Sequence, residues 1–294
     1  MWPWQDDGGR LSPLKLCVLI ALGAPAALVA WRYQAHALGA EPLNAAIHQI
    51  GNWTIELVFL ALAVTPARRI LDWPQVLMLR RMIGVAAFAY AAAHLALYAL
   101  DQKLDLAKVA TEIALRFYLT IGFVALVVLL ALAATSTDGM VRRLGARAWR
   151  RLHRLVYPAA LLAVVHFFLQ TKAALDEPWV MAGLLAWLML YRALAWWRRS
   201  DRRVPAWAIA LLAPVSAVLT ALGEASYFWI KLGVDPVRVL AANLSFDIGA
   251  RPAAVVLAIA VALSAAGALR AALRRAGPRT ALTAPAAGRQ PACG

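Results

Sequence analysis

The amino-acid sequence predicts an all-α polytopic membrane protein. Of its 294 residues, 63% are hydrophobic and the mean hydropathy is +0.67, whereas soluble domains are closer to half apolar. The apolar residues form continuous runs, and a helix of roughly 20 residues spans the hydrocarbon of a bilayer. The runs lack the apolar and polar alternation of a transmembrane β-barrel, so the spans are expected to be helical.

Eight runs are long enough to cross a membrane. The first is expected to be a retained helix rather than a signal peptide, because further spans follow it. We predict a bundle formed by the first six spans and two additional C-terminal spans. The predicted spans cover residues 14–31, 47–65, 83–100, 117–134, 154–170, 179–197, 205–222 and 252–269.

The basic residues indicate the orientation of the spans. The net charge of +15 could suggest nucleic-acid binding, but the arginines gather in short segments after every second span, which is the pattern of a topology signal. We therefore expect no nucleic-acid partner, a bacterial inner-membrane location, and both termini in the cytoplasm. The arginine-rich segments hold Arg68, Arg69, Arg80 and Arg81, then Arg142, Arg143, Arg147, Arg150, Arg151 and Arg154, then Arg198, Arg199, Arg202 and Arg203, and finally Arg270, Arg274, Arg275, Arg279 and Arg289.

Two histidines lie inside apolar runs. The spans 83–100 and 154–170 run in the same direction under this topology, and His94 and His166 fall at similar depth in their outer halves. Ionisable side chains inside a membrane are costly and often functional, and neutral imidazole is a good axial ligand for haem iron. We predict that His94 and His166 bind one haem between them. The alternative is two core histidines that are hydrogen-bonded to backbone or hydroxyl groups.

His153 precedes His166 by 13 residues, which is about 20 Å along an ideal helix. The two side chains do not share a face of a straight helix, although Pro158 between them could kink it. The positions at matching depth on the span 83–100 are Arg80 and Arg81, so a second bis-histidine haem is not expected. His153 could bind a cofactor with another residue, contact a flavin or quinone, or cap the arginine-rich loop.

Other polar residues permit rival functions. Glu56 is the one acid within a predicted span, and with His94 and His166 it could form the relay of a proton-coupled transporter. A purely structural membrane anchor is a third hypothesis. His48 could contact a haem edge or lie at the interface, and Arg192 can extend its charge to the membrane surface and is assigned no role.

Several motifs are absent from the sequence. Cys17 and Cys293 stand at opposite ends of the chain, and there is no CxxC, CxxCH or zinc-type spacing, which argues against an iron–sulfur cluster, an attached c-type haem or a disulfide framework. There is also no GxGxxG or Walker loop, so we expect both the electron donor and the electron acceptor to be separate molecules.

Four motifs resemble one known family in their order along the chain. They are RRMIG at 80–84, AxxHLxxY at 91–98, TST at 135–137 and WxxLHRLVY at 149–157. Over about residues 41–197 the chain resembles the MsrQ family of haem-binding membrane subunits of the MsrPQ protein-methionine-sulfoxide reductase system, within the ferric-reductase-like transmembrane group. Beyond residue 203 the chain departs from the family pattern.

The resemblance implies a six-helix core with haem b, and FMN at a site that no motif identifies. It implies an electron carrier rather than a catalytic subunit, which takes electrons from the quinone pool or a flavin reductase and passes them to a periplasmic molybdopterin subunit that reduces methionine sulfoxide in proteins. The family's haem ligands correspond to His94 and His166, with His153 as a further cofactor-binding candidate.

The expected organisation has four parts. An N-terminal segment with the first span covers residues 1–40, and the ferric-reductase-like core covers 41–203. Two extra spans with a periplasmic connector cover 204–270, and a disordered cytoplasmic tail covers 271–294. The tail is expected to be disordered because it is rich in Pro, Ala and Gly.

Overall fold

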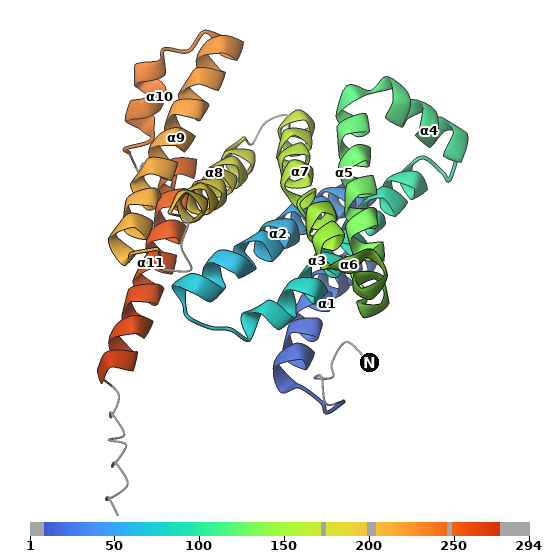
Figure 1. Ribbon diagram of the computed structural model, residues 1–294. Coiled ribbons are helices and arrows are strands. Elements are labelled where there is room, and N and C mark those ends of the chain that lie inside the picture. Colours follow the sequence, from blue (N-terminus) through green and yellow to red (C-terminus); the bar gives the residue numbers. More distant parts are fainter. Residues whose placement is uncertain (1–8, 172–174, 199–203, 246–248, 277–294) are drawn as a thin grey trace, which may run out of the picture.

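The molecule is a bundle of long helices that lie side by side (Figure 1). The computed structural model describes residues 9–171, 175–198, 204–245 and 249–276, and within these ranges the chain forms helices and no β-strand. Eight helical segments are long and apolar enough to cross a membrane, which confirms the predicted fold class. They are α1 (Pro13–Gln34), α2 (Pro42–Ile70), α3 (Val76–Asp101), α5 (Phe117–Ala134), α7 (Val156–Gln170) together with the helix α6 that leads into it, α8 (Asp176–Trp197), α9 (Ala206–Leu232) and α11 (Pro252–Ala276).

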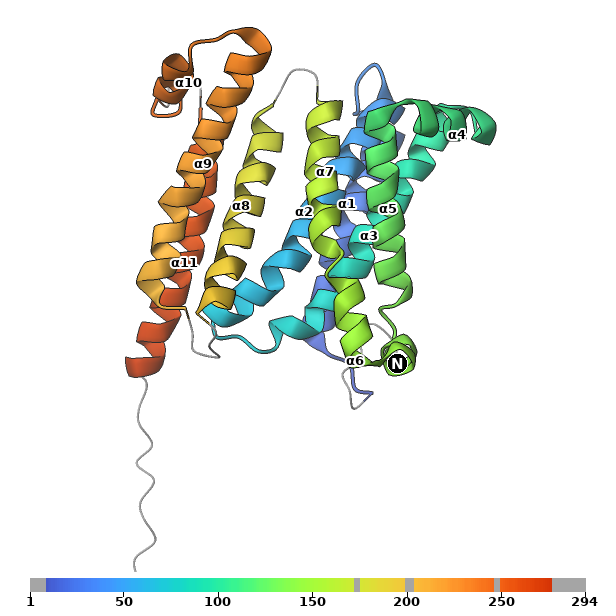
Figure 2. The same ribbon diagram turned by 45° about the horizontal axis from the view of Figure 1, so that its top comes forward.

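Two further helices, α4 and α10, and the helix α6 lie at the ends of the bundle (Figure 2). Helices α4 (Leu106–Leu115) and α10 (Pro236–Ala242) lie at one end, which we call the α4 end. Helix α6 (Asp138–His153) lies at the other, the α6 end, together with the α2–α3 turn and the C-terminal end of α11. The described parts of the arginine-rich segments therefore share one end of the bundle, whereas Arg199, Arg202, Arg203, Arg279 and Arg289 lie outside the described residues.

Several helices extend beyond their predicted bounds. Helix α3 begins at Val76, so Arg80 and Arg81 lie inside its first two turns. Helix α9 continues to Leu232, so Tyr227, Phe228 and Trp229 form part of the helix rather than of a connecting segment. Helix α11 reaches position 276, inside the predicted tail, and residues 277–294 lie outside the described part of the chain.

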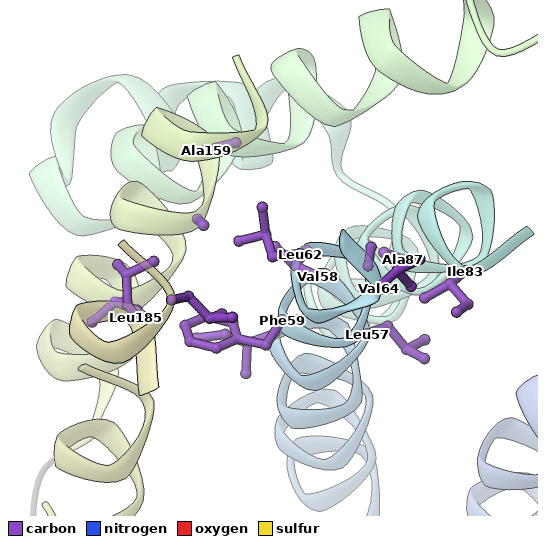
Figure 3. Close-up of a cluster of buried hydrophobic side chains, with 14 of the residues drawn as sticks. Leu57, Val58, Phe59, Leu62, Val64, Ile83, Ala87, Ala159 and Leu185 are labelled. Carbon is purple, nitrogen blue, oxygen red and sulfur yellow. The ribbon is translucent and has the colours of Figure 1, made fainter. Parts of the chain in front are cut away.

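Helix α2 is the centre of the bundle. It contacts α1, α3, α7, α8 and α11, and 44% of its membrane window is buried, the largest share among the eight spans. Figure 3 shows its side chains meeting Ile83 and Ala87 of α3, Ala159 of α7 and Leu185 of α8. The buried residues that Figure 3 labels on α2 are Leu57, Val58, Phe59, Leu62 and Val64.

A tyrosine of α3 forms hydrogen bonds with the backbone of α1 beside a proline. Pro25 lies inside α1, and a proline disturbs the helical hydrogen bonds around it. The Tyr90 hydroxyl donates to the carbonyl of Leu22 at 2.7 Å and accepts from the backbone N–H of Ala26 at 3.0 Å. Because unpaired backbone groups are costly inside a bilayer, this hydroxyl both restores the bonding of α1 and fixes α1 against α3.

Helices α9 and α11 pack against each other and against α8. Small residues allow the close approach, as is common in membrane helices: a methyl group on Gly183 of α8 would lie 2.6 Å from Val256 of α11. Glu224 of α9 is 1% exposed and pairs with Arg251 at 2.5 Å. The longer α9 therefore brings a buried acid, Glu224, into a membrane-crossing helix.

Candidate functional site: a pair of facing histidines

His94 lies in the last two turns of α3, beside α2. Its Nδ1 is 2.9 Å from the carbonyl oxygen of Ile47, and its side chain lines a cavity between the helices. A carbonyl oxygen can only accept a hydrogen bond, so Nδ1 carries the hydrogen and donates it. The lone pair of the neutral ring is then on Nε2, the atom that remains for a metal.

His166 has the same arrangement on the other side of this cavity. It lies near the end of α7, beside α5. Its Nδ1 donates to the carbonyl oxygen of Tyr118 at 2.8 Å. This second hydrogen bond again leaves Nε2 with the free lone pair.

The ring centres of the two imidazoles lie at a distance that suits a shared metal. Their ring centres are 6.3 Å apart and their planes are 87° apart. A bond between a transition metal and a histidine nitrogen is about 2.0–2.1 Å long and a ring centre lies roughly 1.1 Å from its own Nε2, so two rings on opposite sides of one metal have centres about 6.3 Å apart. Within the described residues, no cluster of three or more His, Cys, Asp or Glu side chains could hold a metal ion. A site with two protein ligands therefore suits a metal whose other ligands come from a macrocycle.

The cavity between these rings has a volume of about 420 Å³. Its inner wall is apolar and includes small side chains, which leave space beside the rings. Its lining becomes polar at the α4 end, where the helices begin or end. The apolar wall includes Val58, Ala91, Ala125, Leu129 and Ala163, and the polar lining includes His48, Asp101, Lys108, Glu112, Arg116 and Gln170.

The sequence patterns did not predict that two glycines belong to the site. Gly51 of α2 lies against the ring of His94, and Gly122 of α5 lies against the ring of His166. The carbonyl acceptors of Ile47 and Tyr118 were also missed. Helix glycines have many roles, and only the pairing of α2 with α3 and of α5 with α7 makes these two part of the site.

His153 lies away from the histidine pair, at the α6 end. Its Nδ1 is 3.1 Å from the carbonyl oxygen of Trp149, its Nε2 is 3.4 Å from Oγ of Ser136, and its ring stacks on Trp149 with centres 3.9 Å apart. Trp149 also donates to the carbonyl of Thr135 at 2.9 Å. The TST and WxxLH motifs thus meet, and they fix α6 against the end of α5.

The chain from His153 to His166 is helical apart from one interruption. Helix α6 ends at His153, Arg154 and Leu155 form a turn, and α7 begins at Val156. Pro158 therefore lies in the first turn of α7, where its missing N–H removes no helical hydrogen bond. The helix is therefore interrupted at Arg154 and Leu155, within one helical turn of Pro158.

Glu56 lines a neighbouring cavity of about 340 Å³ instead of the cavity between the histidines. Asp176 and Glu177 of α8 line it as well, and Asn52 donates to Glu177 at 3.0 Å. The three residues of the rival relay, Glu56, His94 and His166, are therefore divided between two cavities. Residues from the start of α11 complete the cavity of Glu56.

Comparisons with known proteins identify the family to which the chain is similar. Residues 50–164, which include His94 and end two positions before His166, match the family model described as "Ferric reductase like transmembrane component". No solved structure matches the chain.

Curated relatives cover the larger part of the chain. It is 42% identical to the protein-methionine-sulfoxide reductase heme-binding subunit MsrQ of Rhodospirillum rubrum over 203 residues, which are 68% of this chain and 95% of the relative. The subunits of the same name from Caulobacter vibrioides and Xanthomonas campestris are 40% and 41% identical, over 64% and 65% of this chain and 90% of each relative. The chain therefore belongs to the MsrQ family of protein-methionine-sulfoxide reductase heme-binding subunits.

Proposed function

We propose that this protein is a transmembrane electron carrier in which His94 and His166 are the axial ligands of one haem b. The observation that carries the proposal is the pair of imidazoles 6.3 Å apart, each with its Nδ1 already bonded to a backbone carbonyl. The names of the relatives, which describe heme-binding subunits, support it. When bound, haem supplies one-electron exchange between ferric and ferrous iron.

The cavity has the polarity that a haem requires. A haem is an apolar macrocycle with two carboxylates, and the cavity has an apolar wall and a polar mouth at the α4 end. Lys108 at this mouth is a cation that suits a carboxylate group, and Arg116 beside it pairs with Glu112. The alanines that line the cavity, including Ala91 and Ala163, leave room for a flat group.

The two carbonyl acceptors tune the ligands. A ligand histidine that donates its other N–H to a carbonyl is held in one tautomer and one orientation, and its basicity rises. Ile47 has this role for His94, and Tyr118 has it for His166. A more basic imidazole stabilises the higher charge of ferric iron, so both hydrogen bonds favour the donation of an electron.

We propose that the carrier lies in the bacterial inner membrane with its α6 end and both termini in the cytoplasm. The gathering of arginines at the α6 end supports this orientation. The histidine pair would then lie near the periplasmic face, because both side chains are in the last turns of α3 and α7 before the α4 end. A reporter enzyme that is active only in the cytoplasm, fused to the C-terminus, should be active; activity only of a periplasmic reporter would contradict the orientation.

Electrons would enter from the quinone pool or a cytosolic flavin reductase. They would leave to a periplasmic molybdopterin subunit that reduces methionine sulfoxide in oxidised proteins. The name of the relatives, subunits of a protein-methionine-sulfoxide reductase, supports such a partner. FMN, which the family resemblance implies, would be a second redox group; flavin and haem measured per polypeptide in the purified protein test for it.

We propose a division into a core and an extension. Residues 1–40 hold the first helix, 41–203 form the haem-binding core and 204–270 the extension, followed by a tail to residue 294. The curated Rhodospirillum relative supports this division, since 95% of it aligns with only 68% of this chain. The hydrogen-bonded pair of Arg251 and Glu224 would hold the extension together beside α8.

Difference spectra test the ligands. The reduced-minus-oxidised spectrum of the purified protein should show the bands of a low-spin haem b, and His94→Ala and His166→Ala should each lose them. His36→Asn is the matched control, because His36 is exposed and has a positive φ of 53° that asparagine tolerates. Unchanged bands in both alanine variants would refute the assignment, and a colourless protein with substrate-dependent uptake would favour a transporter.

A further inference from the structure

The two histidines contact their neighbouring helices in the same way. On α2, the carbonyl of Ile47 accepts from His94, and the residue four positions later is Gly51. On α5, the carbonyl of Tyr118 accepts from His166, and the residue four positions later is Gly122. Each imidazole therefore meets a carbonyl and a glycine that are one helical turn apart.

The spacing has a physical reason. In a helix, side chains point toward the N-terminus, so a residue covers the turn before it. The side chain four positions after a carbonyl would therefore cover that carbonyl on the outside of the helix. A carbonyl oxygen has two lone pairs, so it can accept from a histidine besides its helical partner, but only if that cover is missing. Because glycine has no side chain, Gly51 leaves the carbonyl of Ile47 accessible, and Gly122 leaves the carbonyl of Tyr118 accessible.

The space at each glycine is already filled by the ring. A Cβ on Gly122 would lie 2.7 Å from Cε1, 2.8 Å from Nδ1 and 3.1 Å from Nε2 of His166. A Cβ on Gly51 would lie 3.0 Å from Cε1 and 3.1 Å from Nδ1 of His94. Contacts below 3.0 Å force a displacement, so a methyl group must move the ring of His166, whereas the ring of His94 must yield only a few tenths of an ångström.

We propose that Gly51 and Gly122 are positioning residues for the haem ligands. They admit each imidazole to a backbone carbonyl, which fixes Nδ1–H as the donor and holds the two ring planes 87° apart. This inference rests on the proposed ligation by His94 and His166. Gly122 has the larger effect of the two, because its contacts with the ring are the shorter.

The experiment compares Gly122→Ala and Gly51→Ala with Gly23→Ala in the full-length purified protein. Gly23 lies on α1 with nothing within 4 Å of an added Cβ, so it controls for the substitution itself. Alanine favours a helix more than glycine does, so all three variants should insert and fold. The thermal unfolding midpoint measured without haem checks this.

Three readouts report on the rings rather than on folding. Haem affinity should fall by about 10-fold or more in Gly122→Ala, the range seen when a partner of a metal ligand is lost, and less in Gly51→Ala. The ferric protein should show the strongly anisotropic low-spin electron paramagnetic resonance signal of perpendicular axial planes, and Gly122→Ala should change it. The midpoint potential should shift in Gly122→Ala and stay unchanged in Gly23→Ala.

The outcomes separate this proposal from the function on which it rests. If His94→Ala and His166→Ala lose the low-spin bands while Gly122→Ala and Gly51→Ala behave like Gly23→Ala in all three readouts, the positioning role is refuted and the ligation stands. If both histidine variants keep the bands, the ligation is refuted and the positioning role with it. A graded loss, largest in Gly122→Ala, supports the proposal.

Discussion

Arg192 of α8 donates a hydrogen bond of 2.6 Å to the backbone carbonyl of Leu62 in α2. The residue four positions after Leu62 is Pro66, which has no N–H, so this carbonyl has no partner within its own helix. Arg192 also donates to the hydroxyl of Tyr157 in α7 at 3.2 Å and lies over its ring, 5.2 Å from the ring centre. Arg192 thus joins three helices instead of extending its charge to the membrane surface.

We predict that Arg192→Leu destabilises the protein through this carbonyl. An unpaired buried acceptor costs about 1–3 kcal/mol. In a Pro66→Ala background, the new N–H of residue 66 can bond Leu62, so the same Arg192→Leu change should cost less. Free energies of unfolding in mixed micelles for the four proteins of this double-mutant cycle measure the difference. Equal costs of Arg192→Leu in both backgrounds would show that the Leu62 carbonyl is not the reason.

Tyr90→Phe should loosen α1. The change removes the hydroxyl that bonds both Leu22 and Ala26 beside Pro25, and two backbone groups then lose their partner, at a cost of about 1–3 kcal/mol. Hydrogen exchange at the amides of α1 should rise together with a lower thermal midpoint. Tyr33→Phe is the control, since Tyr33 lies at the end of α1 with 41% exposure, and exchange that matches this control would contradict the prediction.

His153→Gln should leave the haem of the histidine pair in place. Both ring nitrogens of His153 already have partners, Trp149 and Ser136, so we expect unchanged haem per polypeptide and unchanged low-spin bands. The attachment of α6 should weaken instead, seen as faster proteolysis of the α5–α6 turn. A loss of part of the haem in this variant would instead identify His153 as a ligand of a second haem.

Arg251→Met should destabilise the extension because it leaves Glu224 buried without its cation. Breaking a buried ion pair by removing one partner costs about 3–5 kcal/mol. The double variant Glu224→Gln with Arg251→Met should recover much of this loss, since a neutral amide keeps an acceptor for Asn243, which now donates to Glu224 at 2.8 Å. Unfolding in mixed micelles measures each variant, with the exposed Arg238→Met as control. A double variant as unstable as Arg251→Met alone would argue against the pair.

The sequence determined the spans and the matched depth of the two histidines. Apolar runs of membrane length leave helices as the solution for a chain that must satisfy its own backbone. The arginine pattern then gave α3 and α7 the same direction. His94 and His166 could be paired on that basis alone, because depth along a membrane helix follows directly from position in the chain.

Only the tertiary structure decided what surrounds each ring. The acceptors Ile47 and Tyr118, the glycines that uncover them, and the separation of Glu56 from the histidines depend on which helices are neighbours and how they are rotated. Apolar runs carry little information about either, because almost every face of a helix such as α5 is apolar. Arg192 shows the same limit: its role follows from a missing N–H on another helix, 126 positions away in the chain.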